Sequence, residues 1–178
     1  TKVRKMYSSL YQITEDLKRE YGSLDNLPWG DYDDPQGAEA VMNIFASKMR
    51  VLKNCGTRSG CWATVPHTSL SGNDIVRHYD KDSSYAKVLL SDGSSIALVA
   101  RASDCTHIYL GLENRCGVIA YDVNGARAPN KLGKDLHEFV VTKDKGLVPK
   151  GVNMDNCRPG GNGEGCTMKI LRDSNINW

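Results

Sequence analysis

Apolar residues in the first twenty positions recur every three or four residues, which is the spacing of one face of a helix. The pattern predicts a helix over residues 2–20, and Gly22 follows its last turn as the residue that ends it. The apolar positions are Val3, Met6, Leu10, Ile13 and Leu17. We expect Ile13 and Leu17 to pack on the rest of the fold, because the other side of the helix is charged.

A second helical pattern runs from Ala38 to Leu52, after a loop over residues 24–37 that is rich in proline and glycine. Asn54-Cys55-Gly56 is expected to end this helix. Its apolar side is formed by Val41, Met42, Ile44, Phe45, Met49 and Leu52.

From residue 85 the apolar period shortens to that of strands. Strands over residues 85–90 and 96–100 flank Ser91-Asp92-Gly93-Ser94, and strands over 136–142 and 147–148 flank Lys143-Asp144-Lys145-Gly146. Both arrangements are typical of hairpins. Further strands are expected over residues 118–123 and, near the end, Lys169 to Leu171. Helices first and an antiparallel meander afterwards predict an α+β fold with a helix packed on one face of the sheet.

Length and composition place the chain among globular proteins. Its 178 residues suit one domain over 1–178, with parts at 1–22, 23–84 and 85–178. Apolar residues make up 40% and charged residues 25%, which is ordinary for such a domain. A net charge of +2 offers no electrostatic reason to bind nucleic acid or an acidic membrane.

Six cysteines form three close pairs in the sequence: Cys55 with Cys61, Cys105 with Cys116, and Cys157 with Cys166. Six cysteines allow fifteen pairings, but each close pair brackets glycine-rich or polar residues that suit a short loop. We therefore expect disulfides between neighbours. A zinc site is the weaker interpretation, because Cys-x-x-Cys spacing with a nearby histidine is missing. Disulfides imply an oxidising compartment, and hence an export segment removed before Thr1.

The sequence contains no convincing catalytic motif. Ser59-Gly60-Cys61-Trp62-Ala63 is faintly similar to the active-site segment of papain-like proteases, but Pro66 forbids the long helix that should follow, and too few residues remain for the required histidine. The zinc-hydrolase motif, the nucleophile elbow and the phosphate-binding loop are absent. We therefore expect a protein that is not an enzyme, with isolated surface histidines at His67, His78, His107 and His137.

Two acidic segments are candidates for cation binding. Asp122-Val123-Asn124-Gly125 offers oxygen ligands on alternate residues, and Asp135 can return to them, so Asp122, Asn124 and Asp135 are a speculative calcium site. The alternative is a turn in which the side chains of Asp122 and Asn124 bind backbone N–H groups. The earlier loop is a solvated segment or a second calcium site, through Asp25, Asp31, Asp33 and Asp34.

Taken together, several segments resemble the globular part of bacterial type IV pilin-like proteins, which carry a prepilin-type cleavage and methylation segment. The resemblance covers most of the chain from the second predicted helix to Cys166, and its most specific part is the stretch from Asp122 to Asp135. The matching segments are Lys53-Asn54-Cys55-Gly56, Gly60-Cys61-Trp62, the hairpin from Leu89 to Ile96, Cys116-Gly117-Val118-Ile119, Asp122-Val123-Asn124-Gly125, Pro129-Asn130, Gly133, Asp135 and Gly165-Cys166.

The resemblance implies that residues 1–22 are the C-terminal half of one long helix, whose apolar first half precedes this sequence. It implies processing by a prepilin peptidase and anchoring in the inner membrane. It further implies that the subunit assembles with copies of itself or with other pilin-like subunits. The product is a type IV pilus-like or type II secretion-like filament at the cell surface or in the periplasm. Three disulfides depart from the single C-terminal disulfide of many pilins. The alternative function is a secreted adhesion or ligand-binding module that forms no filament.

Overall fold

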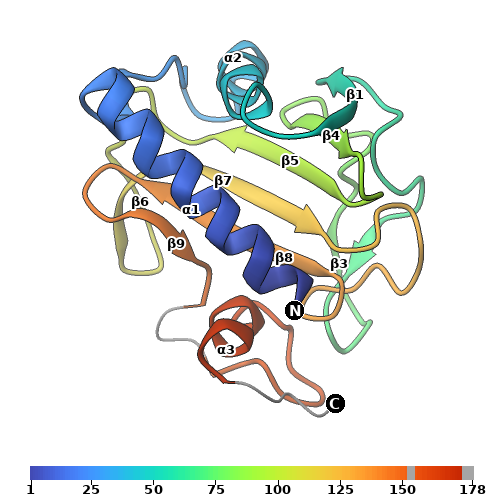
Figure 1. Ribbon diagram of the computed structural model, residues 1–178. Coiled ribbons are helices and arrows are strands. Elements are labelled where there is room, and N and C mark those ends of the chain that lie inside the picture. Colours follow the sequence, from blue (N-terminus) through green and yellow to red (C-terminus); the bar gives the residue numbers. More distant parts are fainter. Residues whose placement is uncertain (152–154, 174–178) are drawn as a thin grey trace.

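The computed structural model describes residues 1–151 and 155–173. Figure 1 shows an antiparallel sheet with helices α1 and α2 on one face, and a helix, α3, beside α1 at the edge near the N-terminus. The fold is therefore α+β, with α1 and α2 before the sheet in the chain, as the sequence predicts, and α3 after it. Among the described residues, no helix combines the length and the apolar character that a membrane crossing needs.

Helix α1 (Lys2–Tyr21) agrees with the predicted helix. The Thr1 side chain accepts a hydrogen bond from the Arg4 N–H, and Gly22 ends the helix with φ 81°, a left-handed conformation that favours glycine. The face toward the sheet is fully or almost fully buried through Val3, Leu10, Ile13, Thr14 and Leu17. This helix therefore contributes its whole apolar stripe to the core.

Helix α2 (Pro35–Ala46) is shifted toward the N-terminus relative to the prediction. Asp34 caps it by accepting from the Gln36 N–H at 3.0 Å, and Pro35 stands in the first turn, where no N–H is needed. The prediction that the helix reaches Leu52 is wrong, because β1 (Val51–Gly56) pairs there with β4. Leu52 is 68% exposed, so its helical spacing does not reflect burial.

Trp29 lies in the layer between α2 and the sheet, in the loop that follows the short 3-10 helix η1 (Leu24–Asn26). It is fully buried, and its indole N–H donates to the Leu24 carbonyl oxygen at 2.8 Å. Two glycines make room for it. A Cβ on Gly37 would lie 1.7 Å from the Trp29 carbonyl oxygen, and one on Gly117 would lie 2.5 Å from the indole ring.

Within the described residues the main sheet has seven strands, and all its pairings are antiparallel. The two predicted hairpins are present as β4–β5 and β8–β9, and the strand predicted over 118–123 begins earlier, at Leu112. The order is β1-β4-β5-β7-β8-β9, and β6 pairs with the start of β7. The bounds are β4 Ala86–Leu90, β5 Ser95–Ala100, β6 His107–Tyr109, β7 Leu112–Asp122, β8 Leu136–Thr142 and β9 Gly146–Pro149.

The second face of the sheet is partly covered by the segment between β1 and β4, which contains only the short strands β2 (His67–Thr68) and β3 (Ile75–Arg77). An apolar cluster that includes Trp62 and Tyr79 packs it on the sheet, and buried polar bonds add to this contact. The fully buried Lys87 ammonium, on β4, donates to the carbonyl oxygens of Thr57, Asp80 and Asp82 at 3.0–3.1 Å. Three acceptors satisfy all three ammonium protons, so this buried cation is fully hydrogen-bonded.

The three disulfides join the neighbours that the sequence predicts: Cys55–Cys61, Cys105–Cys116 and Cys157–Cys166. They close loops of the kind that a small sheet does not order alone, and they fit an oxidising, extracytoplasmic compartment. The expected strand from Lys169 to Leu171 is wrong, because α3 (Cys166–Arg172) occupies this segment. Ile170 and Leu171 pack on the α1 side of the core as neighbours on a helical turn.

Replacement of Leu17 by alanine tests the packing of α1. Leu17 is fully buried against the sheet, so Leu17→Ala is expected to lower the free energy of unfolding by ~2–5 kcal/mol. Ser9→Ala on the exposed side of the same helix is the matched control, and it should change stability by less than about 0.5 kcal/mol. Urea unfolding measures both, and equal curves for Leu17→Ala and wild type would show that α1 is not packed in solution.

Candidate functional site

The Asp122 carboxylate, at the end of β7, is already engaged by protein groups. Its Oδ2 lies 2.5 Å from His67 Nε2, with both side chains fully buried, and its Oδ1 accepts from the Asn124 N–H at 3.0 Å. Burial raises the pKa of the Asp122 carboxyl, and the hydrogen bond from His67 opposes that shift. Asp122 therefore connects the end of the sheet to the β2–β3 layer.

The other two residues of the speculative calcium site also bind within their own loop. Asp135 accepts from the backbone N–H groups of Asn130 and Lys131, both at 2.6 Å, and the Asn124 side chain donates to the Ala128 carbonyl oxygen at 3.2 Å. Among the described residues, no group of three or more His, Cys, Asp or Glu side chains is placed to hold a metal ion. The geometry favours the alternative, a loop capped by its own side chains, except that Asn124 binds a carbonyl oxygen and not the predicted N–H group.

The earlier acidic segment is divided among separate structural roles. Asp25 pairs with Lys143 at 3.2 Å, Asp33 pairs with Arg101, and Asp34 caps α2. These carboxylates do not converge, in keeping with the metal search over the described residues. The second speculative calcium site, at Asp25, Asp31, Asp33 and Asp34, is therefore not supported by the structure.

The expectation that all four histidines lie at the surface is wrong. His67 and His137 are fully buried, and His107 and His78 are partly buried. His67 is covered because it packs edge-on against Trp62 and Tyr79, whose ring centroids lie 5.4 and 5.5 Å from its own. His137 is covered because it lies on the interior strand β8, where its Nε2 donates to the Lys134 carbonyl oxygen at 3.2 Å.

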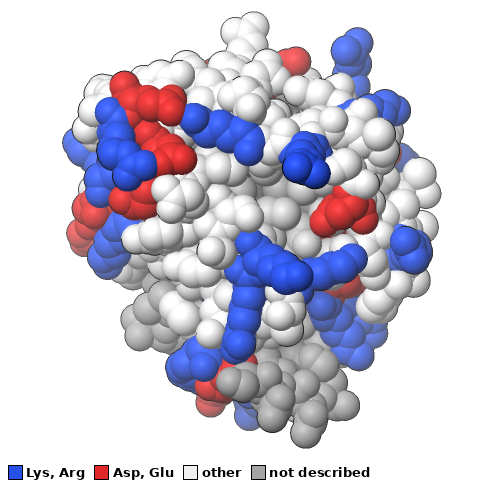
Figure 2. Space-filling view, viewed as in Figure 1, with Lys and Arg blue, Asp and Glu red and all other residues white. Residues whose placement is uncertain are grey.

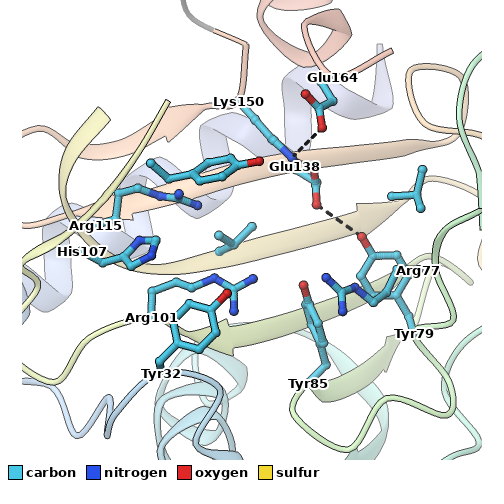
Figure 3. Close-up of a pocket in the computed structure, with 13 residues that line it drawn as sticks. Tyr32, Arg77, Tyr79, Tyr85, Arg101, His107, Arg115, Glu138, Lys150 and Glu164 are labelled. Atoms are coloured by element: carbon cyan, nitrogen blue, oxygen red, sulfur yellow. Dashed lines mark hydrogen bonds and ion pairs between the residues drawn. The ribbon is translucent and has the colours of Figure 1, made fainter. Parts of the chain in front are cut away.

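The feature with most binding character is a cavity of about 260 Å³ on the second face of the sheet, opposite α1 (Figure 3). Tyrosines and cations dominate its lining, and carboxylates face them. These side chains come from segments spread over most of the chain: Tyr32, Arg77, Tyr79, Tyr85, Arg101, His107, Tyr109, Arg115, Glu138, Lys150 and Glu164, with Val76 and Val118.

Glu138 lies at the centre of a polar chain across the cavity. Its carboxylate accepts from Lys150 Nζ at 2.6 Å and from the Tyr79 hydroxyl at 3.3 Å, and Figure 3 shows it pointing into the space between them. Burial acts to raise the pKa of the Glu138 carboxyl, but Lys150 and the hydrogen bond from Tyr79 outweigh it and hold the pKa below its usual value. Burial also raises the pKa of the Tyr85 hydroxyl, to about 12, so the phenol stays neutral.

Three arginines line the cavity, and two of them have carboxylate partners. Arg101 pairs with Asp33, and Arg77 pairs with Asp82 at 3.1 Å. Arg115 is only 5% exposed, and no salt bridge from it is found among the described residues; its buried Nε has no hydrogen-bond partner there. Burial, reinforced by the Arg101 charge, lowers the pKa of the Arg115 guanidinium.

The position of Arg115 depends on an irregularity in β7. The pairing of β7 with β8 shifts register between Arg115 and Gly117, as in a β-bulge. A bulge breaks the alternation of side chains, so Arg115 lies on the cavity side together with Val118, whereas Cys116 packs in the core on the α1 side. Tyr109 lies over the guanidinium, 5.0 Å from ring centroid to Cζ.

None of the cavity residues was singled out from the sequence as a binding residue. They do not form a motif, because they come from several strands and loops between residues 32 and 164. One signal was available: Glu138 shares a strand face with Leu136 and Val140, so a charge interrupts an apolar face of a predicted strand. Arg115 carried no such signal, since its direction is set by the bulge.

Asp122→Ala tests whether the Asp122 loop is structural. The substitution removes the buried partner of His67 and the Asn124 cap, and we expect a loss of about 2–4 kcal/mol in stability. Asp92→Ala is the matched control, because Asp92 accepts from the Ser94 N–H in the same way in an exposed turn, and its loss should be about 1 kcal/mol or less. The melting temperature of wild type should be the same in chelator and in millimolar calcium. A melting temperature that rises with calcium in wild type but not in Asp122→Ala would support the metal site instead.

His137 should make the fold sensitive to mild acid. Burial lowers its pKa from 6.5 to about 4, since Nδ1 is buried without a partner among the described residues and its protonation is unfavourable there. Between pH 6.5 and 4 the unfolded chain binds a proton at His137 that the folded chain does not. The free energy of unfolding is therefore highest above about pH 6.5, and it falls by about 3 kcal/mol as the pH drops toward 4. Urea unfolding across this range should show a shallower pH dependence for His137→Gln than for wild type, and equal slopes would contradict the assignment.

Comparison with known proteins gives no relative for the fold or the cavity. The chain matches no protein-family model, no curated protein sequence and no solved structure. An assignment of function therefore rests on the residues of this chain and on their geometry.

Proposed function

We propose that this chain is the globular part of a non-enzymatic filament subunit of the type IV pilin-like class, a pilin or a secretion-system pseudopilin. Two things support the proposal. The first is the resemblance of the segments from the second predicted helix to Cys166. The second is the place of α1, which lies along one face of an antiparallel sheet, with its apolar stripe buried and its other side open (Figure 1).

The single observation that carries the proposal is the exposed start of α1. Thr1 is exposed at the edge of the fold, so a preceding helix would lie outside the core, and where it ran on into α1 it would replace the Thr1 cap. Figure 2 shows Lys and Arg side chains around this end of the helix, where the sequence places Lys2, Arg4 and Lys5. Basic residues at that point suit the exit of a helix from an apolar environment into water.

Such an upstream helix would account for both stages of filament formation. About 20 apolar residues span a bilayer before assembly. The same apolar helices pack against one another in a filament core after assembly. In this interpretation the open side of α1, which includes Tyr11 at 43% exposure, faces neighbouring subunits.

The alternative, a secreted adhesion or ligand-binding module outside any filament, is favoured by the cavity on the second face of the sheet. The two functions differ in what precedes Thr1 in the gene. A prepilin-type cleavage segment followed by about 20 apolar residues belongs to the filament subunit. A conventional signal peptide cleaved just before Thr1 belongs to the secreted module.

The gene itself tests the proposal. We expect the upstream sequence to encode the prepilin segment, and the full-length product to appear in sheared surface filaments when it is expressed with a prepilin peptidase. Tyr11→Ala on the open side of α1 should reduce filament yield without changing the melting temperature. Leu52→Ala, at an even more exposed apolar residue on β1, is the control and should leave the yield unchanged. A conventional signal peptide, or a product that stays monomeric after processing, would exclude the filament.

A further inference from the structure

The Arg115 guanidinium is a buried cation that forms no ion pair of its own with the described residues, because the nearby Glu138 carboxylate is bonded to Lys150. Each other cation of the cavity faces a carboxylate: Arg77 faces Asp82, Arg101 faces Asp33, and Lys150 faces Glu138. Arg115 is 5% exposed and forms no salt bridge among the described residues. Burial of an unpaired charge is unfavourable unless a partner arrives, so this position is suited to an anion from solution.

The remaining charges limit that anion to one negative charge. A guanidinium matches a planar carboxylate by two parallel N–H···O bonds. The Glu138 carboxylate stands in the same cavity, and it would repel a dianion such as a phosphate monoester. One unpaired guanidinium next to a fixed carboxylate therefore favours a single carboxylate group.

The rest of the lining suits the body of a sugar ring. Glu138 accepts hydrogen bonds and Lys150 donates them, which is what ring hydroxyls require. Val118 on the sheet and the rings of Tyr79 and Tyr85 offer apolar surface for the C–H faces of a ring. The volume of about 260 Å³ lies below the ~300–1,000 Å³ typical of drug-sized ligands and suits one ring unit.

We propose that this cavity binds a single uronic-acid-type sugar, with its carboxylate on Arg115 and its hydroxyls at Glu138 and Lys150. The sugar is either a free acid or the terminal residue of a glycan, and both present the same carboxylate and ring. The site lies on the face opposite α1, so it does not depend on assembly into a filament.

Titration calorimetry and thermal melts of the intact chain test the proposal. We expect D-glucuronate to bind saturably and to raise the melting temperature, and D-glucose, which lacks the carboxylate, to do neither. Methyl β-D-glucuronide represents the terminal residue of a glycan. Binding of the glycoside alone supports a glycan ligand, and binding of glucuronate alone supports the free acid. Binding of both supports the site for either source. Equal binding of glucose and glucuronate, or no binding of either uronate, would overturn the proposal. Acetate or inorganic phosphate as tight as glucuronate would overturn the sugar assignment.

Variants separate recognition from folding. Arg115→Gln removes the unpaired charge, so it should weaken glucuronate binding by about 10- to 100-fold without lowering the melting temperature. Arg172→Gln, at an exposed arginine on α3, should bind as wild type does. If Arg115→Gln melts well below wild type, Arg115→Lys provides a second variant, which keeps the positive charge but loses the two parallel N–H donors and should also weaken binding. Unchanged affinity in both variants would show that the cavity is not the site.

Discussion

The buried Lys87 ammonium is the contact on which the second layer of this protein depends. It projects from β4 and donates to three backbone carbonyl oxygens of the segment that crosses the sheet. That segment has only two short strands of its own, so regular hydrogen bonding does not hold it in place. Burial acts to lower the pKa of Lys87, but a fully hydrogen-bonded ammonium is much less costly than an isolated one. Loss of the ammonium would leave three carbonyl groups without their partner.

Asp80 adds to this polar framework as an acceptor, whereas Lys87 is a donor. Its carboxylate accepts from the N–H groups of Gly60 and Trp62, at 2.8 and 3.1 Å, and so fixes the loop closed by Cys55 and Cys61. The His67–Asp122 pair then joins the far end of the layer to the end of β7. Because these bonds are directional, they define one position of the layer, which apolar packing alone does less strictly. One wall of the cavity, with Arg77 and Tyr79, belongs to this layer.

The two faces of the sheet are covered through different kinds of interaction. The α1 and α2 face is an apolar core built from helical stripes, whereas the second face combines a small apolar cluster with buried charges. A surface for assembly along α1 and a binding cavity on the opposite side would therefore not compete for the same residues.

The sequence by itself determined what depends on local periodicity and short loops. Apolar stripes identified α1, alternating strands identified both hairpins, and close spacing identified all three disulfides. It misplaced the end of α2 and the form of the α3 segment, because Leu52 and Lys169 to Leu171 have spacings that suit more than one structure until a neighbour is chosen. Only the tertiary structure decided the burial of His67 and His137, the contact between Asp122 and His67, and the cavity. Each of these joins residues that are far apart in the chain, and a bulge in β7 aims Arg115, so long-range packing and register, rather than local pattern, determine them.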